Sequence, residues 1–309
     1  MNVCVVIVTF NKLDFLKKAL LSYERQTKLP QYVIVVNNNS TDGTKEYLSE
    51  WSNVKCEFQK KVINLQINSG GSGGFYVGMQ EALNINCDWI WVSDDDAYPE
   101  KNALENILNF EQKNPQIMNN VVALCSKVTD YGKKNIGLGH RTRKGTFLGI
   151  TCFSKKVPIE EYNKDYFSFD YLSYVGSMIR KSTIQSQGLP NKDFFIYFDD
   201  FEHSIRLRQK GLFLCIPSSC VIHEGESDGM TKNKDATWRD YYATRNVLLS
   251  LKWHYGIVSF FLRALMRLLT SLKSRNVVKI KIFWKGILDA RKDIVGVDDI
   301  YKPGWKKDK

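Results

Sequence analysis

The sequence predicts an α/β fold in which a mixed sheet is flanked by helices and followed by a helical extension. Over the first 125 residues, short apolar runs alternate with segments of helical periodicity, which is the order of βαβ units. Polar loops follow the predicted strands, at the edge where open α/β sheets bind their ligands. Residues 251–309 instead carry two amphipathic helical patterns, which predict the extension.

The individual elements follow from periodicity and turn chemistry. Asn11 and Asp14 can cap the first helix, and Ser40, Asp42 and Gly43 are turn residues that lead into the second. In the first half the predicted strands are 3–9, 32–37 and 89–93, and the predicted helices are 13–23, 44–50 and 78–83. Later we expect an exposed, basic, Gly-rich loop at 137–145, a strand at 194–199, a helix at 202–210, and extended segments at 214–217 and 221–222.

We place the sheet domain at residues 1–250 and a basic tail at 251–309. Residues 250–309 hold 14 Lys and Arg against 5 Asp and Glu, which is most of the chain's net charge of +11. The first tail helix has a polar stripe opposite an apolar face, formed by Ser259, Arg263, Arg267, Thr270 and Ser274 opposite Ile257, Phe260, Phe261, Leu265, Leu268, Leu269 and Leu272. The second repeats the arrangement, with Lys281, Lys285, Asp289 and Lys292 opposite Ile280, Phe283, Trp284, Ile287 and Leu288.

Two interpretations of the tail are open. The helices pack on the core as ordinary surface helices, or they lie as a pair on a membrane surface, where basic polar faces opposite Phe, Trp and Leu are typical of the headgroup region. The charge by itself leaves nucleic acid, anionic lipid and an anionic glycan carrier as partners, because net charge steers ligands without identifying them.

Composition excludes several classes of protein. With 43% hydrophobic and 25% charged residues and seven prolines, the chain is neither collagenous, low-complexity nor disordered. Seven cysteines without a C-x-x-C pair favour neither a disulfide framework nor structural zinc and fit a reduced cytosol. The apolar N-terminus lacks a basic n-region, so it predicts a buried strand rather than a signal peptide. The longest apolar stretch, 256–272, contains Arg263 and Arg267, so we expect no membrane span of roughly 20 residues.

The strongest chemical motif is Asp94–Asp95–Asp96, directly after the apolar run 89–93. In an extended chain Asp94 and Asp96 project to the same side, so that two oxygen ligands converge on one hard cation while Asp95 stays free for another contact. An acidic turn or helix cap is the alternative. Three adjacent carboxylates without a cation would repel one another, and this favours a metal site.

The second motif is the glycine-rich run 68–75, with four glycines in five residues before a predicted helix. Such a run lets backbone approach a ligand and presents N–H groups at a helix start to anions. Neither the dinucleotide pattern G-x-G-x-x-G nor a P-loop is present. A flexible turn fits this run equally well when it is taken alone.

The third motif places Asp199, Asp200 and Glu202 at the end of an aromatic run, with His223 further along. A carboxylate in apolar surroundings can accept a proton from a hydroxyl, and a histidine can complete an oxygen-rich metal shell. The alternative is that Asp199 and Glu202 are helix caps and His223 is a hydrogen-bonded loop residue.

These motifs, in this order, resemble the family 2 glycosyltransferases, inverting enzymes of GT-A fold that use a nucleotide sugar and a divalent cation. The resemblance rests on 3–11, on 33–44 and on the triple Asp, and it covers about residues 1–250. More narrowly, 68–75, the triple Asp and 188–206 look like the galactofuranosyltransferase and rhamnosyltransferase branch.

The resemblance implies a role for each candidate residue. Asp94, Asp96 and His223 would hold Mn²⁺ or Mg²⁺ against the donor diphosphate, and Asp200 would be the general base. The implied donor-binding residues are Thr9, Asn37, Asn68, Gly70, Gly71 and Asp95, and the implied acceptor-binding residues are Phe75, Asp199 and Arg239. Asn37 stands where the family commonly has Asp, so it keeps a hydrogen-bond acceptor but loses the charge.

The predicted function is inverting transfer of galactofuranose from UDP-galactofuranose to a hydroxyl of a polyprenyl-diphosphate-linked glycan precursor of the cell surface. The enzyme is expected in the cytoplasm, peripheral at the inner face of the cell membrane, with the tail on the anionic lipid surface and with no nucleic acid partner. Rhamnosyl transfer from dTDP-rhamnose is the alternative. A non-catalytic basic protein that binds membrane or nucleic acid is an alternative of another class, disfavoured because clustered carboxylates repel phosphate without a cation. Residues 126–175 are expected to shape acceptor choice.

Overall fold

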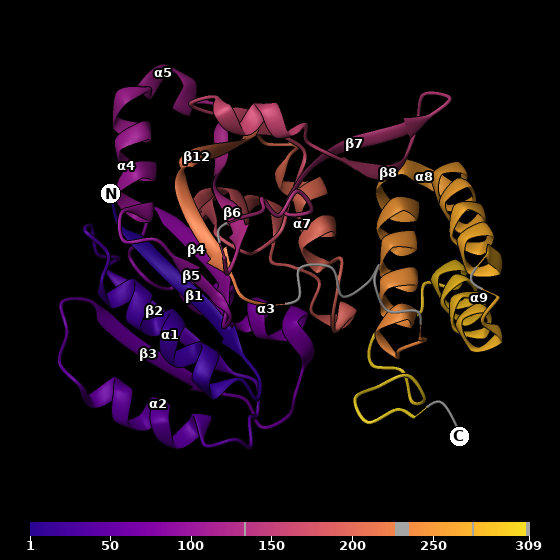
Figure 1. Ribbon diagram of the computed structural model, residues 1–309, viewed down its shortest axis with the longest axis horizontal. Coiled ribbons are helices and arrows are strands. Elements are labelled where there is room, and N and C mark those ends of the chain that lie inside the picture. Colours follow the sequence, from indigo (N-terminus) through magenta and orange to yellow (C-terminus); the bar gives the residue numbers. More distant parts are fainter. Residues whose placement is uncertain (133, 226–234, 274, 307–309) are drawn as a thin grey trace.

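The computed structural model describes residues 1–132, 134–225, 235–273 and 275–306 and contains a large central sheet (Figure 1). Its strands run in the order β3-β2-β1-β4-β11-β6-β12-β5, and β9 pairs with β12. The bounds are β1 (Val3–Thr9), β2 (Tyr32–Asn37), β3 (Gln59–Asn64), β4 (Trp89–Asp94), β5 (Ala97–Pro99), β6 (Val121–Asp130), β9 (Phe167–Phe169), β11 (Ser177–Arg180) and β12 (Leu212–His223).

The sheet is mixed, as predicted. Strands β1, β2, β3 and β4 are parallel, and β11 joins them antiparallel to β4 and β6, which is itself parallel to β12. Thr9 pairs with Asn37, and Val8 pairs with Asp94, so the carboxyl ends of the neighbouring strands reach the same edge. Polar residues at these ends are therefore brought together.

Helices cover both faces of the sheet. Trp89 and Trp91 of β4 pack into one core with α1 (Leu13–Glu24), α2 (Thr44–Asn53), α4 (Ala103–Lys113) and α5 (Pro115–Met118). The intervening Ile90 and Val92 pack into the other core with α3 (Gly70–Leu83), α6 (Lys181–Gln187) and the end of α7 (Asp199–Leu207). Because successive residues of a strand face opposite sides, a strand buried on both faces has a continuous apolar sequence.

A second sheet has the order β10-β7-β8, with β10 (Tyr171–Leu172), β7 (Arg141–Phe147) and β8 (Ile150–Lys156). The prediction of an exposed loop at 137–145 is therefore wrong from residue 141 onward, and Arg141 is fully buried. Its guanidinium is bound by main-chain oxygens, including those of Ser126, Val175 and Gly176. A 3₁₀ turn, η1 (Ile159–Asn163), follows this sheet.

The predicted strand at 194–199 is also wrong. A short 3₁₀ turn, η2 (Lys192–Phe194), leads into a turn in which Phe195, Tyr197 and Phe198 have φ of 66°, and α7 begins at Asp199. The two predicted extended segments after it are parts of one strand, β12. Residues with positive φ cannot continue a strand, whatever their aromatic content suggests.

The tail is helical as predicted, with α8 (Arg239–Lys273) and α9 (Val277–Arg291) beside β7 and β8 in Figure 1. Gly256 has non-helical backbone angles and divides α8 into two halves. By length and composition α8 is the one described helix that is apolar enough to cross a membrane, although neither half reaches the roughly 20 residues needed. Buried core helices of soluble proteins can be equally long and apolar.

In the second half of α8, the predicted polar stripe lies against the rest of the protein, and much of the predicted apolar face is exposed. Ser259 of the predicted polar stripe is fully buried, and Arg263 and Arg267 are partly buried. Phe261, Leu265, Leu269, Leu272 and, on α9, Trp284 are about half exposed, although Phe260 and Phe283 are buried. Part of the apolar face therefore packs on the rest of the protein, as the first interpretation expects, and part of it is exposed. Ser274 lies outside the described residues.

Candidate active site

Asp94, Asp96 and His223 form a cluster that could hold a metal ion, in which the ligand atoms all lie within 4.8 Å of one another. Asp94 ends β4 and His223 ends β12, so strands far apart in sequence supply the cluster. His223 Nε2 lies 3.1 Å from Asp96 Oδ1. Gly225 packs so closely on Asp96 that a Cβ there would lie 2.4 Å from Oδ2. Two carboxylates and an imidazole are ligands suited to Mn²⁺ or Mg²⁺, and the residues present therefore fit the predicted cation.

Crowding shifts the three neighbouring carboxyl groups differently. Burial and the charge of Asp96 raise the pKa of Asp94 to about 6, and burial raises the pKa of Asp95 to about 7. Burial alone would raise the pKa of Asp96 as well, but the hydrogen bond from His223 and the charges of His223 and Lys12 lower it below its usual range. The cluster thus concentrates negative charge that a cation would balance.

Lys12 is a residue of this site that the sequence analysis missed. Its Nζ lies 2.6 Å from Asp96 Oδ2 and 3.5 Å from Asp95 Oδ1. The main-chain N–H of Phe10 also donates to Asp95, over 3.3 Å. The loop after β1 therefore places one positive side chain beside the Asp94–Asp96–His223 cluster. The position of Lys12, three residues beyond Thr9, was the signal in the sequence that could have identified it.

Thr9 and Asn37, predicted to bind the nucleotide-sugar donor, lie buried at the carboxyl ends of the neighbouring parallel strands β1 and β2. Asn37 Nδ2 donates to Asn64 Oδ1, and its Oδ1 accepts from Ser40 N. Neighbouring Asn38, which the analysis did not select, accepts from Ser69 N and donates to Gly70 O. The amides thus join the ends of β2 and β3 to the start of α3.

The glycine run is the first turn of α3 and not a separate loop. Gly70 has φ of +72°, and a Cβ there would lie 2.0 Å from the main-chain oxygen of Phe195. Asn68 accepts from the N–H of Gly70. Gly74 packs on Val8 in the same way, whereas a Cβ on Gly71 would meet nothing within 4 Å. The glycines therefore serve close packing on β1 and on the 195–198 turn.

Asp199 and Asp200 lie side by side in the first turn of α7. Burial raises the pKa of Asp200 to about 7, an effect opposed by the N–H of Phe201, which donates to its Oδ1 over 2.7 Å. Burial and the charge of Asp200 raise the pKa of Asp199 well above its usual range. Asp200 can therefore exist as a carboxylate near neutral pH and accept a proton, whereas Asp199 stays protonated.

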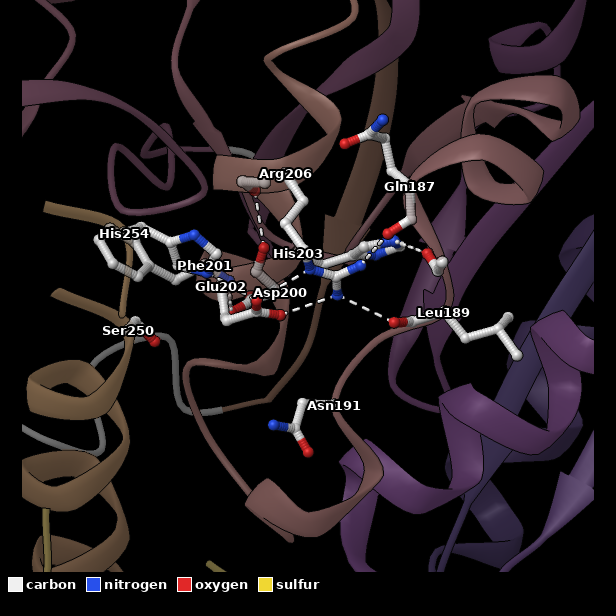
Figure 2. Close-up of polar contacts among 12 residues, drawn as sticks. Gln187, Leu189, Asn191, Asp200, Phe201, Glu202, His203, Arg206, Ser250 and His254 are labelled. Carbon is white, nitrogen blue, oxygen red and sulfur yellow. Dashed lines mark hydrogen bonds and ion pairs between the residues drawn. The ribbon is translucent and has the colours of Figure 1, made fainter. Parts of the chain in front are cut away.

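Figure 2 shows how α7, which carries Asp200, is held in place. Glu202 accepts from Arg206 Nη2 at 2.8 Å and lies 2.8 Å from His254 Nε2 on α8. Arg206 also donates to the main-chain oxygens of Gln187 and Leu189. Burial would raise the pKa of Glu202, but the hydrogen bonds of His254 and Arg206 lower it to about 2. Glu202 is thus an anchor of the helix and not a metal ligand or a base.

The predicted acceptor residues Phe75 and Arg239 differ in exposure. Phe75 is buried, with its ring centroid 4.7 Å from that of Tyr174, whose pKa is raised by burial and by the charges of Asp199 and Asp200. Arg239 is exposed at the start of α8 and stacks on Trp238, and its charge acts on nearby Tyr197. His140 was missed, and its ring packs edge-on against that of His223 at 5.3 Å. No spacing rule connects residues so far apart.

The ends of β4 and β12 thus bring together side chains that could hold a metal ion, and α7 carries the carboxyl group of Asp200, whose pKa is raised by burial and in part by the charge of Asp94. The family model described as glycosyl transferase family 2 matches residues 4–184, more than half of the chain. The protein belongs to this family and is a glycosyltransferase of GT-A fold, as the sequence predicted.

Curated relatives are named galactofuranosyltransferases. The chain is 25% identical over 211 residues to galactofuranosyltransferase GlfT1 of Mycolicibacterium smegmatis, covering 68% of this chain and 66% of that protein. It is 27% identical over 230 residues to GlfT1 of Mycobacterium tuberculosis, covering 74% and 71%. The match thus spans just under two thirds of the length of the first relative.

Solved structures share the fold at low sequence identity. S. aureus TarS 1–349 superposes with a TM-score of 0.59 at 14% identity, covering 94% of this chain and 81% of that one. GalNAc-T7, solved with UDP, GalNAc and Mn²⁺, superposes with a TM-score of 0.64 at 14% identity, covering 95% and 56%. At such identities the likeness concerns the fold alone.

Proposed function

We propose that this glycosyltransferase is metal-dependent and inverting, and that it moves galactofuranose from UDP-galactofuranose to a hydroxyl of a polyprenyl-diphosphate-linked glycan. The observation that carries the proposal is that Asp94, Asp96 and His223 lie together, while Asp200 on α7 is half-buried, and its burial and the nearby charge of Asp94 raise its pKa. Similarity to the two GlfT1 proteins supports galactofuranose as the sugar. Rhamnose from dTDP-rhamnose is the second candidate, because the motifs 68–75, Asp94–Asp95–Asp96 and 188–206 also resemble the rhamnosyltransferase branch.

The donor would bind along the carboxyl edge of β1, β2 and β4. Asp94, Asp96 and His223 would hold Mn²⁺ or Mg²⁺, which when bound neutralises the departing nucleoside diphosphate. Lys12, now paired with Asp96, would lie against the same negative charge. Thr9 and Asn37 would face the nucleoside from the neighbouring strand ends.

Asp200 would take the proton of the acceptor hydroxyl. The hydroxyl oxygen then bonds to the anomeric carbon as the bond from that carbon to the diphosphate oxygen breaks, and the electron pair leaves with the diphosphate. Attack from the face opposite the leaving group inverts the anomeric centre. A carboxyl group with a pKa of about 7 suits this task near neutral pH.

The tail would hold the enzyme on the inner face of the cell membrane. Phe261, Leu265, Leu269 and Leu272 on α8 and Trp284 on α9 are about half exposed, in a segment rich in Lys and Arg. Apolar side chains that enter the interface and cations that meet anionic headgroups match such a surface. A lipid-linked acceptor would be found there.

Calorimetric titration of UDP and of dTDP, each with and without Mn²⁺, tests the donor and the metal together. We expect UDP to bind the wild-type protein only with Mn²⁺ and to lose at least about tenfold in affinity in Asp96→Ala, because a metal ligand is removed. Asp165→Ala, an exposed carboxylate remote from the cluster in sequence, is the control. A preference for dTDP would move the proposed sugar to rhamnose, and binding of neither nucleotide would refute the proposal.

A further inference from the structure

Two neighbouring cavities lie beside the Asp94–Asp96–His223 cluster and beside Asp200, the proposed base. The base cavity, of about 210 Å³, is lined by Asp200 together with Gly139, Thr142, Ser154, Tyr171, Leu172, Ser173, Tyr197, Phe198 and Phe201. The histidine cavity, of about 310 Å³, is lined by His223 together with His140, Gly137, Lys156 and residues of the end of β6 and the following loop. Gly139 lines both cavities, so they adjoin.

One face of the β7–β8 hairpin serves both cavities. Thr142 pairs with Lys156 and Lys144 pairs with Ser154, so these four residues project to the same side of the hairpin. Thr142 and Ser154 line the base cavity, while Lys156 lines the histidine cavity. Between them, His140 Nδ1 lies 2.7 Å from the hydroxyl of Ser173, which forms part of the base cavity wall.

Two of the four aromatic residues that line the base cavity, Tyr197 and Phe198, come from a strained turn. Phe195, Tyr197 and Phe198 all have φ of 66°, a conformation that costs of order 1–3 kcal/mol for each residue with a side chain. The fully buried Asn246 of α8 holds this turn, since its Nδ2 lies 2.9–3.0 Å from the main-chain oxygens of Phe194, Ile196 and Tyr197. Strain that is held so firmly is typical of functional sites.

The chemistry of the walls matches a saccharide. Rings of Tyr171, Tyr197, Phe198 and Phe201 offer apolar surfaces for the C–H faces of a sugar ring, and the hydroxyls of Thr142 and Ser154 offer partners for its hydroxyl groups. Lys156 is exposed and lines the histidine cavity, so its ammonium group is available to oxygen atoms of a ligand. The charge of exposed Arg239, which does not itself line the base cavity, partly offsets the rise that burial causes in the pKa of Tyr197.

We infer that the two cavities form one acceptor groove, in which the accepting sugar lies in the base cavity with its hydroxyl at Asp200 and the next unit of the glycan lies in the histidine cavity beside Lys156. The inference rests on the proposed function and extends it, because it assigns acceptor recognition to the second sheet and to the 195–198 turn. The donor lies on the other side of the metal cluster, toward Lys12.

Filling the base cavity tests the groove in the full-length protein. UDP-galactofuranose and dTDP-rhamnose are supplied with Mn²⁺, and two rates are measured: hydrolysis of the donor by water, and transfer into a chloroform–methanol extract of the host's membranes. In Ser154→Trp we expect the ratio of transfer to hydrolysis to fall roughly 100-fold, because the indole displaces the acceptor from the base. Lys155→Trp, which puts the same ring on the opposite face of β8, keeps the wild-type ratio.

A wild-type ratio in Ser154→Trp would overturn the groove. Absence of both donor hydrolysis and transfer in the wild-type protein, with either donor, would instead refute the proposed function, so the two failures are distinguishable. Lys156→Ala provides a variant that need not disturb packing: we expect its KM for the acceptor extract to rise about tenfold at unchanged KM for the donor, whereas Lys155→Ala leaves both unchanged. If Lys156→Ala leaves the acceptor KM unchanged, the histidine cavity is not part of the groove.

Discussion

Five carboxyl groups within one site have different protonation because their neighbours differ. Asp96 is held ionised by His223 and Lys12, whereas Asp94 and Asp95 have pKa values raised by burial. Asp199 and Asp200 are adjacent in sequence, yet only the pKa of Asp200 stays near neutrality. Residue type therefore identifies the candidates, and environment assigns their roles.

The pH dependence of transfer should report Asp200. Its pKa is raised to about 7, so the carboxylate that accepts the proton is lost as the pH falls through 7. We expect kcat/KM to rise about tenfold from pH 6 to pH 8, following the deprotonated fraction. Asp200→Asn should lower kcat by about 10²–10⁴-fold, because the amide cannot accept the proton.

Asp165→Asn is the matched control, since this aspartate is exposed and lies outside the site. It should keep both the rate and the pH profile of the wild-type protein. An unchanged pH profile in Asp200→Asn would assign the titrating base to another residue.

Sequence patterns could locate the residues at the strand ends, since parallel strands bring their carboxyl ends to one edge. Asp94 and Asp96 were identified from the alternation of side chains after an apolar strand and His223 with the help of the family resemblance, and the structure brings the three together. Lys12 and His140 were not identified, because each joins the site through contact with a residue more than 80 positions away in the sequence. No local pattern encodes such a contact.

At the scale of the elements, a strand can be predicted from the sequence when it is buried and its residues are therefore apolar. The apolar β1 and β2 were predicted with the bounds observed, whereas β3, with the sequence Gln-Lys-Lys-Val-Ile-Asn at the sheet edge, was not predicted at all. The aromatic run 194–199 was misassigned as a strand. Its turn is imposed by Asn246 and by the close approach of Gly70, both distant in sequence.

The start of α3 allows a test of that long-range contact. Gly70→Ala should destabilise the protein by roughly 1–3 kcal/mol or more, because an alanine there has a positive φ and its Cβ meets Phe195 O. Gly71→Ala should be neutral or stabilising by up to about 1 kcal/mol, since its Cβ meets nothing within 4 Å and alanine favours helix. Urea unfolding of both variants measures the difference, and equal stabilities would contradict the described packing of α3 on the 195–198 turn.

At the scale of the whole molecule, three parts meet at the site: the parallel edge of the main sheet, the second sheet and the tail. Asn246 and His254 bind the 195–198 turn and Glu202 of α7, so the first half of α8 supports the helix that carries Asp200, while the second half offers an exposed apolar surface. The sequence placed the start of the tail at residue 251, and α8, which begins at Arg239, crosses this boundary with its first half packed against Phe201 and Ile205 of α7. An exposed apolar surface and the support of the helix that carries Asp200 are therefore properties of one helix.

Binding to lipid vesicles tests the surface of that helix. We expect the full-length protein to float with vesicles that contain anionic phospholipid, and the double variant Leu265→Asp with Leu269→Asp to lose most of this binding, because two half-exposed apolar side chains become charged. Val54→Asp, which replaces an exposed apolar residue after α2, should float like the wild-type protein. Raising the salt concentration should weaken wild-type binding, since part of the attraction is between the basic tail and the lipid headgroups. Equal flotation of the double variant and the wild-type protein would show that this face of α8 does not meet the membrane.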